Sequence, residues 1–393
     1  MKPKSFALES ASSPAPRPAS LHSVARTSRA TIRVLAENDV PAVVALVARV
    51  YPQQQGRWGS PGACESYFRE MIFNNPWRDP ALPSWVAEEN GRVCGCYIVM
   101  ARAMRFRGRP IRVAAACQFM VDRDQRHSLT ALQLAKACLT GPQDLTLADS
   151  ANELSRRLWV RIGGSAPLLY SLHWTRPLRP ARYALSRLEE RAALPPYLTL
   201  PARALGIAAD ALIGRLQPNR FVREESEFAD QPLDAAAMLD HWPEVFDGNA
   251  LQPMYDARSL AWLLDQVARK TAYGALRARA VLDSEQRPIG WYLYYARAGG
   301  VGEVIQIAAR NASFDHVLKR LLADAWRQGA TAVRGRVDPR HAQELSDRHC
   351  WFRREGPWTL VHSRRADILH AIQQGDAFLS RLEGEWWLRF LGD

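Results

Sequence analysis

The apolar positions of the first half of the chain switch between helical and extended spacing. Valines recur at helical intervals from Val40 to Val50, and Ser60-Pro61 opens a second helical pattern. Three strand-like apolar runs follow, at 85–88, 92–106 and 111–121. Asn90-Gly91 and Arg107-Gly108 separate these runs and are typical of tight hairpin turns. The pattern therefore predicts two helices and then an antiparallel set of strands.

The stretch from Gln118 to Gly164 continues this pattern into alternating strands and helices. An apolar strand runs into a turn that contains Arg126, and an amphipathic helix follows. A second strand is expected at 144–148, and then a second helix that ends at Gly163-Gly164. The N–H groups of a first helical turn are unpaired and the helix dipole favours negative charge there. The turn after the first of these strands is therefore a place for a phosphate.

This order of parts resembles the core of the GNAT superfamily of N-acetyltransferases. Val121, Arg126 and Ala131 match the spacing of the family's loop that wraps the pyrophosphate of acetyl-CoA. Asn152, Ser155, Trp159 and Gly163 keep the intervals of its later helix. The resemblance covers about residues 31–175. It implies an α/β fold whose mixed, mostly antiparallel sheet is flanked by helices, and acetyl-CoA as co-substrate without a metal.

The resemblance also assigns the residues that would hold the donor. The thioester carbonyl would lie against the strand backbone near 119–121, and the diphosphate against the turn. The expected contacts are Phe119, Met120, Val121, Arg126, His127, Ser128, Leu129, Thr130, Ala131, Asn152, Ser155 and Trp159.

Two departures from the family pattern concern the same site. His127, Ser128 and Leu129 stand where the family has glycines, which let the backbone approach a ligand closely. Trp159 stands where the family has tyrosine, and an indole N–H cannot replace a phenol as proton donor. These departures leave open that the chain binds without catalysing.

The catalytic groups are not identified by the sequence, which offers three weak candidates. Gln118 can orient a substrate but cannot act as a base. Asp149, at the end of the second strand, is the best-placed carboxylate, and it also suits an N-cap for a helix beginning near Ser150. His173 lies at an expected strand end, where it either reaches the site or is a structural histidine.

The second half repeats the strand and helix order of the first. A shift of 188 positions places Gln118 on Gln306 and Leu134 on Leu322, which indicates a tandem of two GNAT-like modules. The second copy has no counterpart to Arg126 and is expected to be degenerate. The expected division is a disordered tail at 1–30, a donor-binding domain at 31–175, a linker with an amphipathic helix at 176–220, and the second domain at 221–393. The linker helix is expected to pack on its own domain, with an interfacial membrane helix as the alternative.

Composition and charge narrow the function only slightly. The net charge of +12 suits anionic ligands such as CoA phosphates, but it also follows from an arginine-rich composition. No apolar run is long enough to span a membrane. The six cysteines show no metal-ligand spacing and lie mostly in apolar runs, so we expect buried thiols and a cytoplasmic location.

The sequence thus predicts an acyltransferase that moves an acetyl group from acetyl-CoA to an amine or hydroxyl. The expected acceptor is a small molecule or an envelope sugar precursor, and nucleic acid is not the expected partner. Two alternatives stay open: a tRNA-dependent aminoacyl transferase of the peptidoglycan bridge type, and an inactive GNAT-like scaffold.

Overall fold

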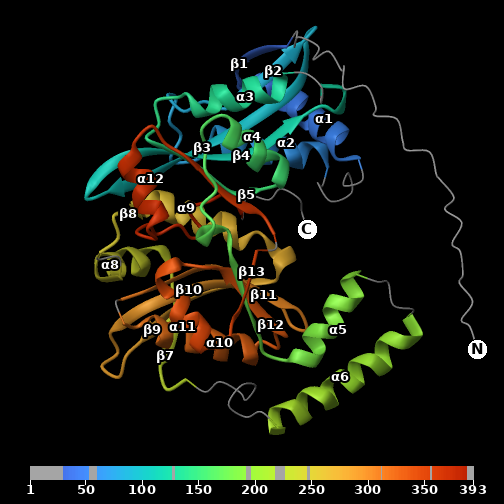
Figure 1. The fold of residues 1–393 in the computed structure, drawn as a ribbon, viewed down its shortest axis with the longest axis vertical. Coiled ribbons are helices and arrows are strands. Elements are labelled where there is room, and N and C mark those ends of the chain that lie inside the picture. The colour runs from blue at the N-terminus through green and yellow to red at the C-terminus, as the bar shows by residue number, and fades with distance from the viewer. Residues whose placement is uncertain are drawn as a thin grey trace, which may run out of the picture.

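The chain builds two mixed sheets that share one strand order (Figure 1). The computed structural model describes residues 30–52, 60–125, 129–191, 196–216, 226–245, 248–310, 312–354 and 356–386. Within these ranges each sheet has seven strands, and the first runs β1-β2-β3-β4-β5-β14 with β8 paired to β3. The second runs β7-β9-β10-β11-β12-β6-β13. The predicted fold class, two α/β modules with mixed, mostly antiparallel sheets, is confirmed.

The first module follows the predicted elements closely. Its elements are β1 (Thr31–Val34), α1 (Val40–Val50), α2 (Pro61–Ile72), β2 (Trp85–Glu89), β3 (Arg92–Phe106), β4 (Arg109–Val121), α3 (Thr130–Leu139), β5 (Leu145–Ala151) and α4 (Glu153–Arg161). Ser60 caps α2, because its hydroxyl accepts from the amide of Ala63 at 3.2 Å. Both residues of each predicted turn have positive φ, from 49° at Arg107 to 78° at Gly108.

The side chains of β3 alternate between two helix-covered faces. Cys96, Ile98 and Met100 pack in the core that contains α1 and α2. Tyr97 and Val99 face the opposite way, toward α3 and α4. The apolar run in the sequence is continuous because helices cover both faces of the strand.

The second module repeats this order. Its elements are β7 (Ala229–Pro232), α8 (Ala235–Val245), α9 (Ala257–Ala268), β9 (Ala275–Leu282), β10 (Pro288–Ala296), β11 (Val301–Ala309), α10 (Phe314–Arg327), β12 (Ala332–Arg336) and α11 (Ala342–Asp347). The short β8 (Leu251–Pro253) joins the first sheet instead. Pairing of β4 with β5 begins at Val113, and pairing of β11 with β12 begins at Val301. These two positions are 188 residues apart, as the repeat in the sequence predicts.

The two sheets exchange strands. After α4 the chain enters β6 (His173–Pro177), which pairs with β12 and with β13 (Trp351–Arg353) in the second sheet. In return β14 (Trp358–His362) pairs with β5 in the first sheet. The expected boundary at residue 175 falls inside β6, so the sheets do not divide where the sequence pattern changes. The domain ranges remain a prediction.

One hydrophobic core runs between the modules. It joins the face of the first sheet under α1 and α2 to the face of the second sheet under α8 and α9. After α12 (Ala366–Gln373), the segment 378–386 returns through this core and buries Phe378, Leu382 and Trp386. Trp386 packs against Tyr273 with ring centroids 4.8 Å apart.

The linker contains two helices rather than one. These are α5 (Pro180–Arg191) and α6 (Pro196–Leu216), which pack against each other and extend away from the sheets (Figure 1). Leu205 and Leu216 of α6 are each 71% exposed, and the expected packing of this helix on its own domain stays a prediction.

Three further features of the described residues concern the cysteines, metal-binding clusters and membrane-spanning helices. All six cysteines are free and buried, as predicted. In the described part of the chain no cluster of three or more His, Cys, Asp or Glu could hold a metal ion. Among the helices described, none combines the length and apolarity needed to cross a bilayer. The expected N-terminal tail lies outside the described residues, apart from Ala30.

Candidate functional site: an opening between β4 and β5

The parallel strands β4 and β5 pair only at their beginnings. In the described residues the register runs from Val113–Leu145 to Ala115–Leu147 and ends there, although β4 continues to Val121 and β5 to Ala151. Gln118 forms a bulge in β4 with φ 45°, between the pairs Ile98–Cys117 and Tyr97–Phe119. A bulge bends its strand and redirects backbone groups. The bulge lies beyond the last β4–β5 pair, where the two strands are no longer joined.

Aromatic side chains gather on the face of the first sheet that α3 and α4 cover. The rings of Tyr97 and Phe119 lie 4.5 Å apart. Trp159 is fully buried, and its Nε1–H donates to the hydroxyl of Tyr97 at 3.0 Å. Burial raises the pKa of Tyr97 well above its ordinary value, so the phenol keeps its proton. A phenol therefore stands beside Trp159, and it comes from β3 rather than from α4.

Glu385 brings a carboxylate to the same place from the end of the described chain. The backbone N–H of Ser150 in β5 donates to its Oε1 at 3.2 Å. Burial first, and the negative charge of Glu385 second, raise the pKa of the Cys117 thiol in β4. The same charge contributes to the raised pKa of Tyr97, after burial and Cys138. The hydrogen bond places the Glu385 carboxylate beside β5, and its position in the sequence does not indicate this.

Asp149 is held in a structural role rather than offered to a substrate. Its carboxylate pairs with Arg336 at 2.9 Å, and both side chains are almost fully buried. It also accepts from the backbone N–H of Glu385 at 2.6 Å. A Cβ added at Gly384 would lie 2.2 Å from this carboxylate, so glycine permits the close approach. Asp149 thus positions the segment that carries Glu385.

The cap of α4 corrects the other role considered for Asp149. Asn152 is the N-cap, and its Oδ1 accepts from the amide of Ser155 at 2.8 Å. The strand β5 extends to Ala151, so the helix begins later than the sequence pattern indicated. Asn152 and Ser155, both expected to contact the donor, make this hydrogen bond with each other.

His173 begins β6 in the second sheet, opposite Arg336. Its side chain is 8% exposed. Burial, followed by the positive charges of Arg381, Arg336, Arg334 and Arg354, lowers its pKa to about 2. The imidazole is therefore neutral. Its connection to the opening is indirect: His173 lies opposite Arg336, and Arg336 pairs with Asp149.

The turn between β4 and α3 holds the remaining expected contacts. Arg126, His127 and Ser128 lie outside the described residues. Leu129 occupies the N-cap position of α3 without a side-chain cap and is 42% exposed, whereas Thr130 is buried and Ala131 lies in the first turn. Met120 packs in the shared core and Val121 is partly buried.

The acidic residue that follows β4, Asp122, is paired with two arginines. It accepts from Arg49 at 2.8 Å and from Arg92 at 2.9 Å. Burial opposes ionisation, but these two arginines outweigh it and lower the pKa of Asp122. Its charge is therefore neutralised before the helix begins.

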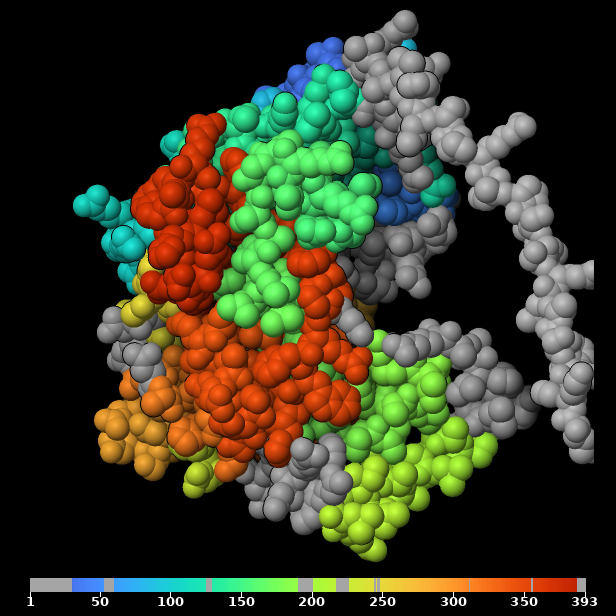
Figure 2. Space-filling view, viewed as in Figure 1, coloured from blue at the N-terminus to red at the C-terminus, as the bar shows by residue number. Residues whose placement is uncertain are grey.

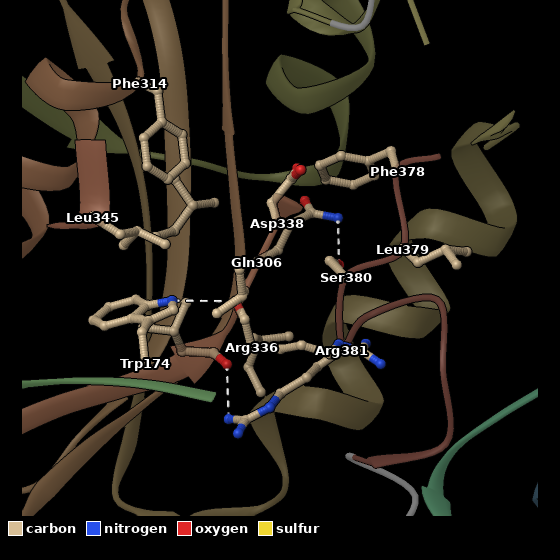
Figure 3. A pocket seen from close by; sticks show the side chains of 14 residues that line it. Trp174, Gln306, Phe314, Arg336, Asp338, Leu345, Phe378, Leu379, Ser380 and Arg381 are labelled. Atoms are coloured by element: carbon tan, nitrogen blue, oxygen red, sulfur yellow. Dashed lines mark hydrogen bonds between the residues drawn. The ribbon is translucent and has the colours of Figure 1, made fainter. Parts of the chain in front are cut away.

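The second module has a matching opening between β11 and β12. Pairing of β11 with β12 ends at Glu303–Arg334, and a bulge follows between the pairs Tyr294–Val304 and Leu293–Gln306. A cavity of only about 40 Å³ remains there (Figure 3), with lining residues that include Trp174, Gln306, Phe314, Arg336, Phe378 and Arg381. Arg381 reaches Glu303 at 3.0 Å and the carbonyl of Val304 at 3.0 Å.

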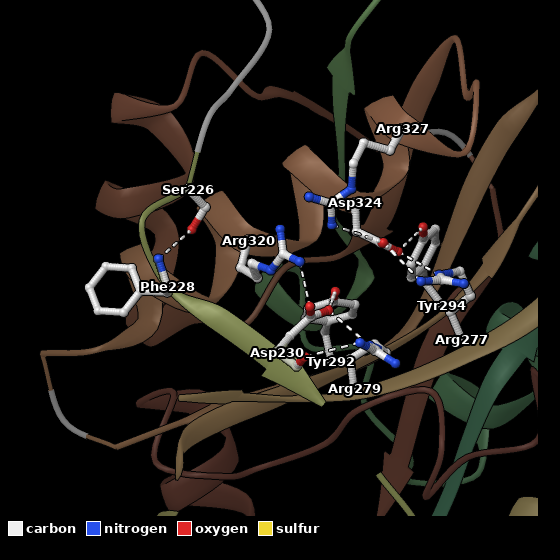
Figure 4. A network of polar contacts seen from close by, with 10 residues as sticks. All are labelled: Ser226, Phe228, Asp230, Arg277, Arg279, Tyr292, Tyr294, Arg320, Asp324 and Arg327. Atoms are coloured by element: carbon white, nitrogen blue, oxygen red, sulfur yellow. Dashed lines mark hydrogen bonds and ion pairs between the residues drawn. The ribbon is translucent and has the colours of Figure 1, made fainter. Parts of the chain in front are cut away.

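Charged groups near α10 of the second module are paired with one another (Figure 4). Asp230 accepts from Arg279 at 2.9 Å and from the hydroxyl of Tyr292 at 2.8 Å. Asp324 accepts from Arg277 at 2.6 Å and from Tyr294 at 2.7 Å. These contacts join β7, β9, β10 and α10, so they stabilise the sheet.

Solved structures with the same fold agree with this arrangement. No protein-family model and no curated protein matches the sequence. A GCN5-related N-acetyltransferase from Anabaena variabilis matches with a TM-score of 0.53 at 10% identity, covering 85% of this chain and 73% of that one. A protein from Enterococcus faecalis described as a probable N-acyltransferase matches with a TM-score of 0.52 at 10% identity, covering 86% and 73%. The chain therefore has the fold of the GCN5-related N-acetyltransferases, as the sequence resemblance indicated.

Proposed function

We propose that the chain is an acyltransferase that binds acyl-CoA in the first module and transfers the acyl group to an amine or hydroxyl. The observation that carries the proposal is the separation of β4 from β5 beside the Gln118 bulge, with a carboxylate and a phenol at the opening. Acetyl-CoA is the donor that the sequence resemblance favours. The described residues offer a fit, since aromatic rings gather on the sheet face that α3 covers and α3 begins after β4.

The groups at the opening suit the two proton transfers of acyl transfer. Bound acyl-CoA would supply an activated thioester. As the acceptor's nitrogen or oxygen bonds to the carbonyl carbon and the C–S bond breaks, Glu385 takes the acceptor's proton. The hydroxyl of Tyr97 gives a proton to the departing sulfur, and Trp159 holds that hydroxyl in place. Glu385 is thus the proposed base and Tyr97 the proposed acid.

Titration calorimetry with acetyl-CoA and longer acyl-CoA thioesters tests the donor site. We expect binding at one site per chain, and turnover with an amine or hydroxyl from an acceptor panel. Absence of binding to folded protein would refute the proposal. Binding without turnover over the whole panel would instead favour the scaffold alternative.

Two matched variants place the donor in one module. Leu129 and Ser313 occupy the N-cap positions of α3 and α10, and neither side chain caps its helix. Aspartate is a good N-cap, so Leu129→Asp and Ser313→Asp should both leave the fold intact. Because a carboxylate repels phosphates, Leu129→Asp should weaken acyl-CoA binding about tenfold and Ser313→Asp should not change it. The reverse pattern would assign the donor to the second module.

A further inference from the structure

The helix pair α5–α6 faces the second sheet across a space that is lined largely by charged residues. The space between this pair and the second sheet is a cavity of about 510 Å³, and its charged lining residues are Arg187, Glu189, Arg203, Arg297, Glu303 and Arg334. A helix that is stabilised by its own domain normally buries its apolar face there. Here charged residues face the domain, so the apolar side is left for something outside the chain.

The exposed side of α6 carries an apolar stripe. Leu205, Leu212 and Leu216 repeat at helical intervals and are 71%, 57% and 71% exposed. Polar contacts fix the helix pair without them, because Asp210 accepts from the amide of Ala181 and from Arg182, both at 2.7 Å. The leucines are therefore not needed to hold α6 on α5.

The apolar surface continues onto the edge of the second sheet. Tyr183 of α5 contacts Trp351 of β13, with ring centroids 6.4 Å apart. Trp351 and its neighbour Phe352 are 45% and 38% exposed. In the space-filling view the α5–α6 pair borders this C-terminal part of the second module on one side of the molecule (Figure 2).

Arginines adjoin the sheet-edge part of this face. Arg353 and Arg354 follow Phe352, and the guanidinium of Arg354 lies 3.7 Å from the ring centroid of Trp358. Arg215 is exposed near the end of the leucine stripe. Aliphatic side chains, a tryptophan and arginines together are typical of surfaces that lie in a membrane interface.

We propose that this face, formed by α5–α6 and β13, binds peripherally to an anionic lipid bilayer. The apolar stripe would enter the headgroup region, and the arginines would pair with lipid phosphates. The net charge of +12 favours the same target. The face is assembled from protruding helices and a sheet edge, and its positive charge selects an anionic surface over an uncharged apolar partner.

Vesicle co-sedimentation of the full chain tests this proposal. The probes are vesicles of phosphatidylcholine alone and of phosphatidylcholine mixed with phosphatidylglycerol. We expect salt-sensitive binding to the mixed vesicles and little to the neutral ones. The triple variant Leu205→Gln, Leu212→Gln, Leu216→Gln should bind the mixed vesicles at least about tenfold more weakly than wild type.

The matched control replaces exposed apolar residues outside this face. Val34→Gln with Met254→Gln changes side chains that are 50% and 40% exposed, and it should leave vesicle binding unchanged. Acyl-CoA titration of each variant reports the donor site separately, so a failure of either proposal is recognised. Unchanged binding of the triple variant, or absence of vesicle binding by folded wild type, would overturn the proposal. So would a wild-type dimer that the triple variant converts to a monomer, because the stripe would then be a protein interface.

Discussion

The openings at β4–β5 and at β11–β12 are built alike but receive different parts of the C-terminal segment. Each has three registered parallel pairs followed by a bulge in the longer strand. In the second module Phe378 and Arg381 line the cavity, and Arg381 is tied to Glu303. In the first module the later part of the same segment reaches β5 and presents Glu385 there. One C-terminal segment therefore places an arginine at one opening and a carboxylate at the other.

This difference shows why a duplicated fold need not carry two sites. The parallel β-strand pair separates in both copies because a bulge redirects the longer strand. What each opening can bind depends on the side chains that the rest of the chain delivers to it.

The largest effect is expected for Glu385→Gln. Removing a general base should lower kcat between about a hundredfold and ten-thousandfold, while acyl-CoA binding stays near wild type. Steady-state kinetics with the best acceptor, together with donor titration, measure the two effects separately.

Glu153→Gln serves as the control for that variant. Glu153 is an exposed carboxylate on α4 that pairs with Arg156 and Arg157, so its replacement should leave kcat unchanged. Full kcat in Glu385→Gln would show that Glu385 is not the general base. The carboxylate would then no longer distinguish the function of the first opening from that of the second.

A second prediction concerns the pH dependence of the unfolding free energy, which we expect to depend on His173 of β6 in the second sheet. The folded-state pKa of His173 lies near 2, below the ordinary value for histidine of about 6.5. The unfolded chain therefore binds a proton that the folded chain does not. Stability from this group is complete above about pH 6.5, and it falls by up to about 1.4 kcal/mol for each pH unit below that value.

Urea unfolding at pH 7, 6 and 5 measures this slope. His173→Gln should flatten it, whereas His370→Gln, at an exposed position on α12, should leave it as in wild type. Equal slopes for wild type and His173→Gln would mean that His173 can be protonated in the folded protein. The β6–β12 junction would then tolerate a further positive charge beside Arg336.

The elements of the first module were predictable because local signals agree with the packing. Asn90-Gly91 and Arg107-Gly108 adopt the positive φ of tight turns, and Ser60 caps α2 as its position before Pro61 indicated. The strand β3 was predictable because helices on both faces require an unbroken apolar run.

The site residues were less predictable because they meet through tertiary contacts. Tyr97 and Trp159 are 62 positions apart, and Ser150 and Glu385 are 235 apart. No local pattern marks Glu385, since its position depends on Gly384 passing Asp149 and on a core shared by both modules. The exchange of β6 and β14 was hidden for the same reason, because strand spacing does not reveal which sheet a strand joins.

The smallest expected effect is the difference in unfolding free energy between Tyr97→Phe and Tyr292→Phe, which change tyrosines at matching positions of the two sheets. Tyr97 pairs with Phe119 in the first sheet, and Tyr292 pairs with Ile307 in the second. Tyr97→Phe would leave the buried Nε1–H of Trp159 without its acceptor, at a cost of about 1 to 2 kcal/mol of unfolding free energy. Tyr292→Phe removes one of several donors to Asp230, so it should cost less, about 1 kcal/mol.

Kinetics of the same two variants sharpen the contrast between the openings. If Tyr97 donates the proton to the departing sulfur, Tyr97→Phe lowers kcat with little change in donor binding, and Tyr292→Phe leaves kcat unchanged. Unfolding curves recorded with the kinetics separate lost stability from lost chemistry. An unchanged kcat in Tyr97→Phe would restrict Tyr97 to supporting Trp159, and the proton would have to come from another group at the first opening.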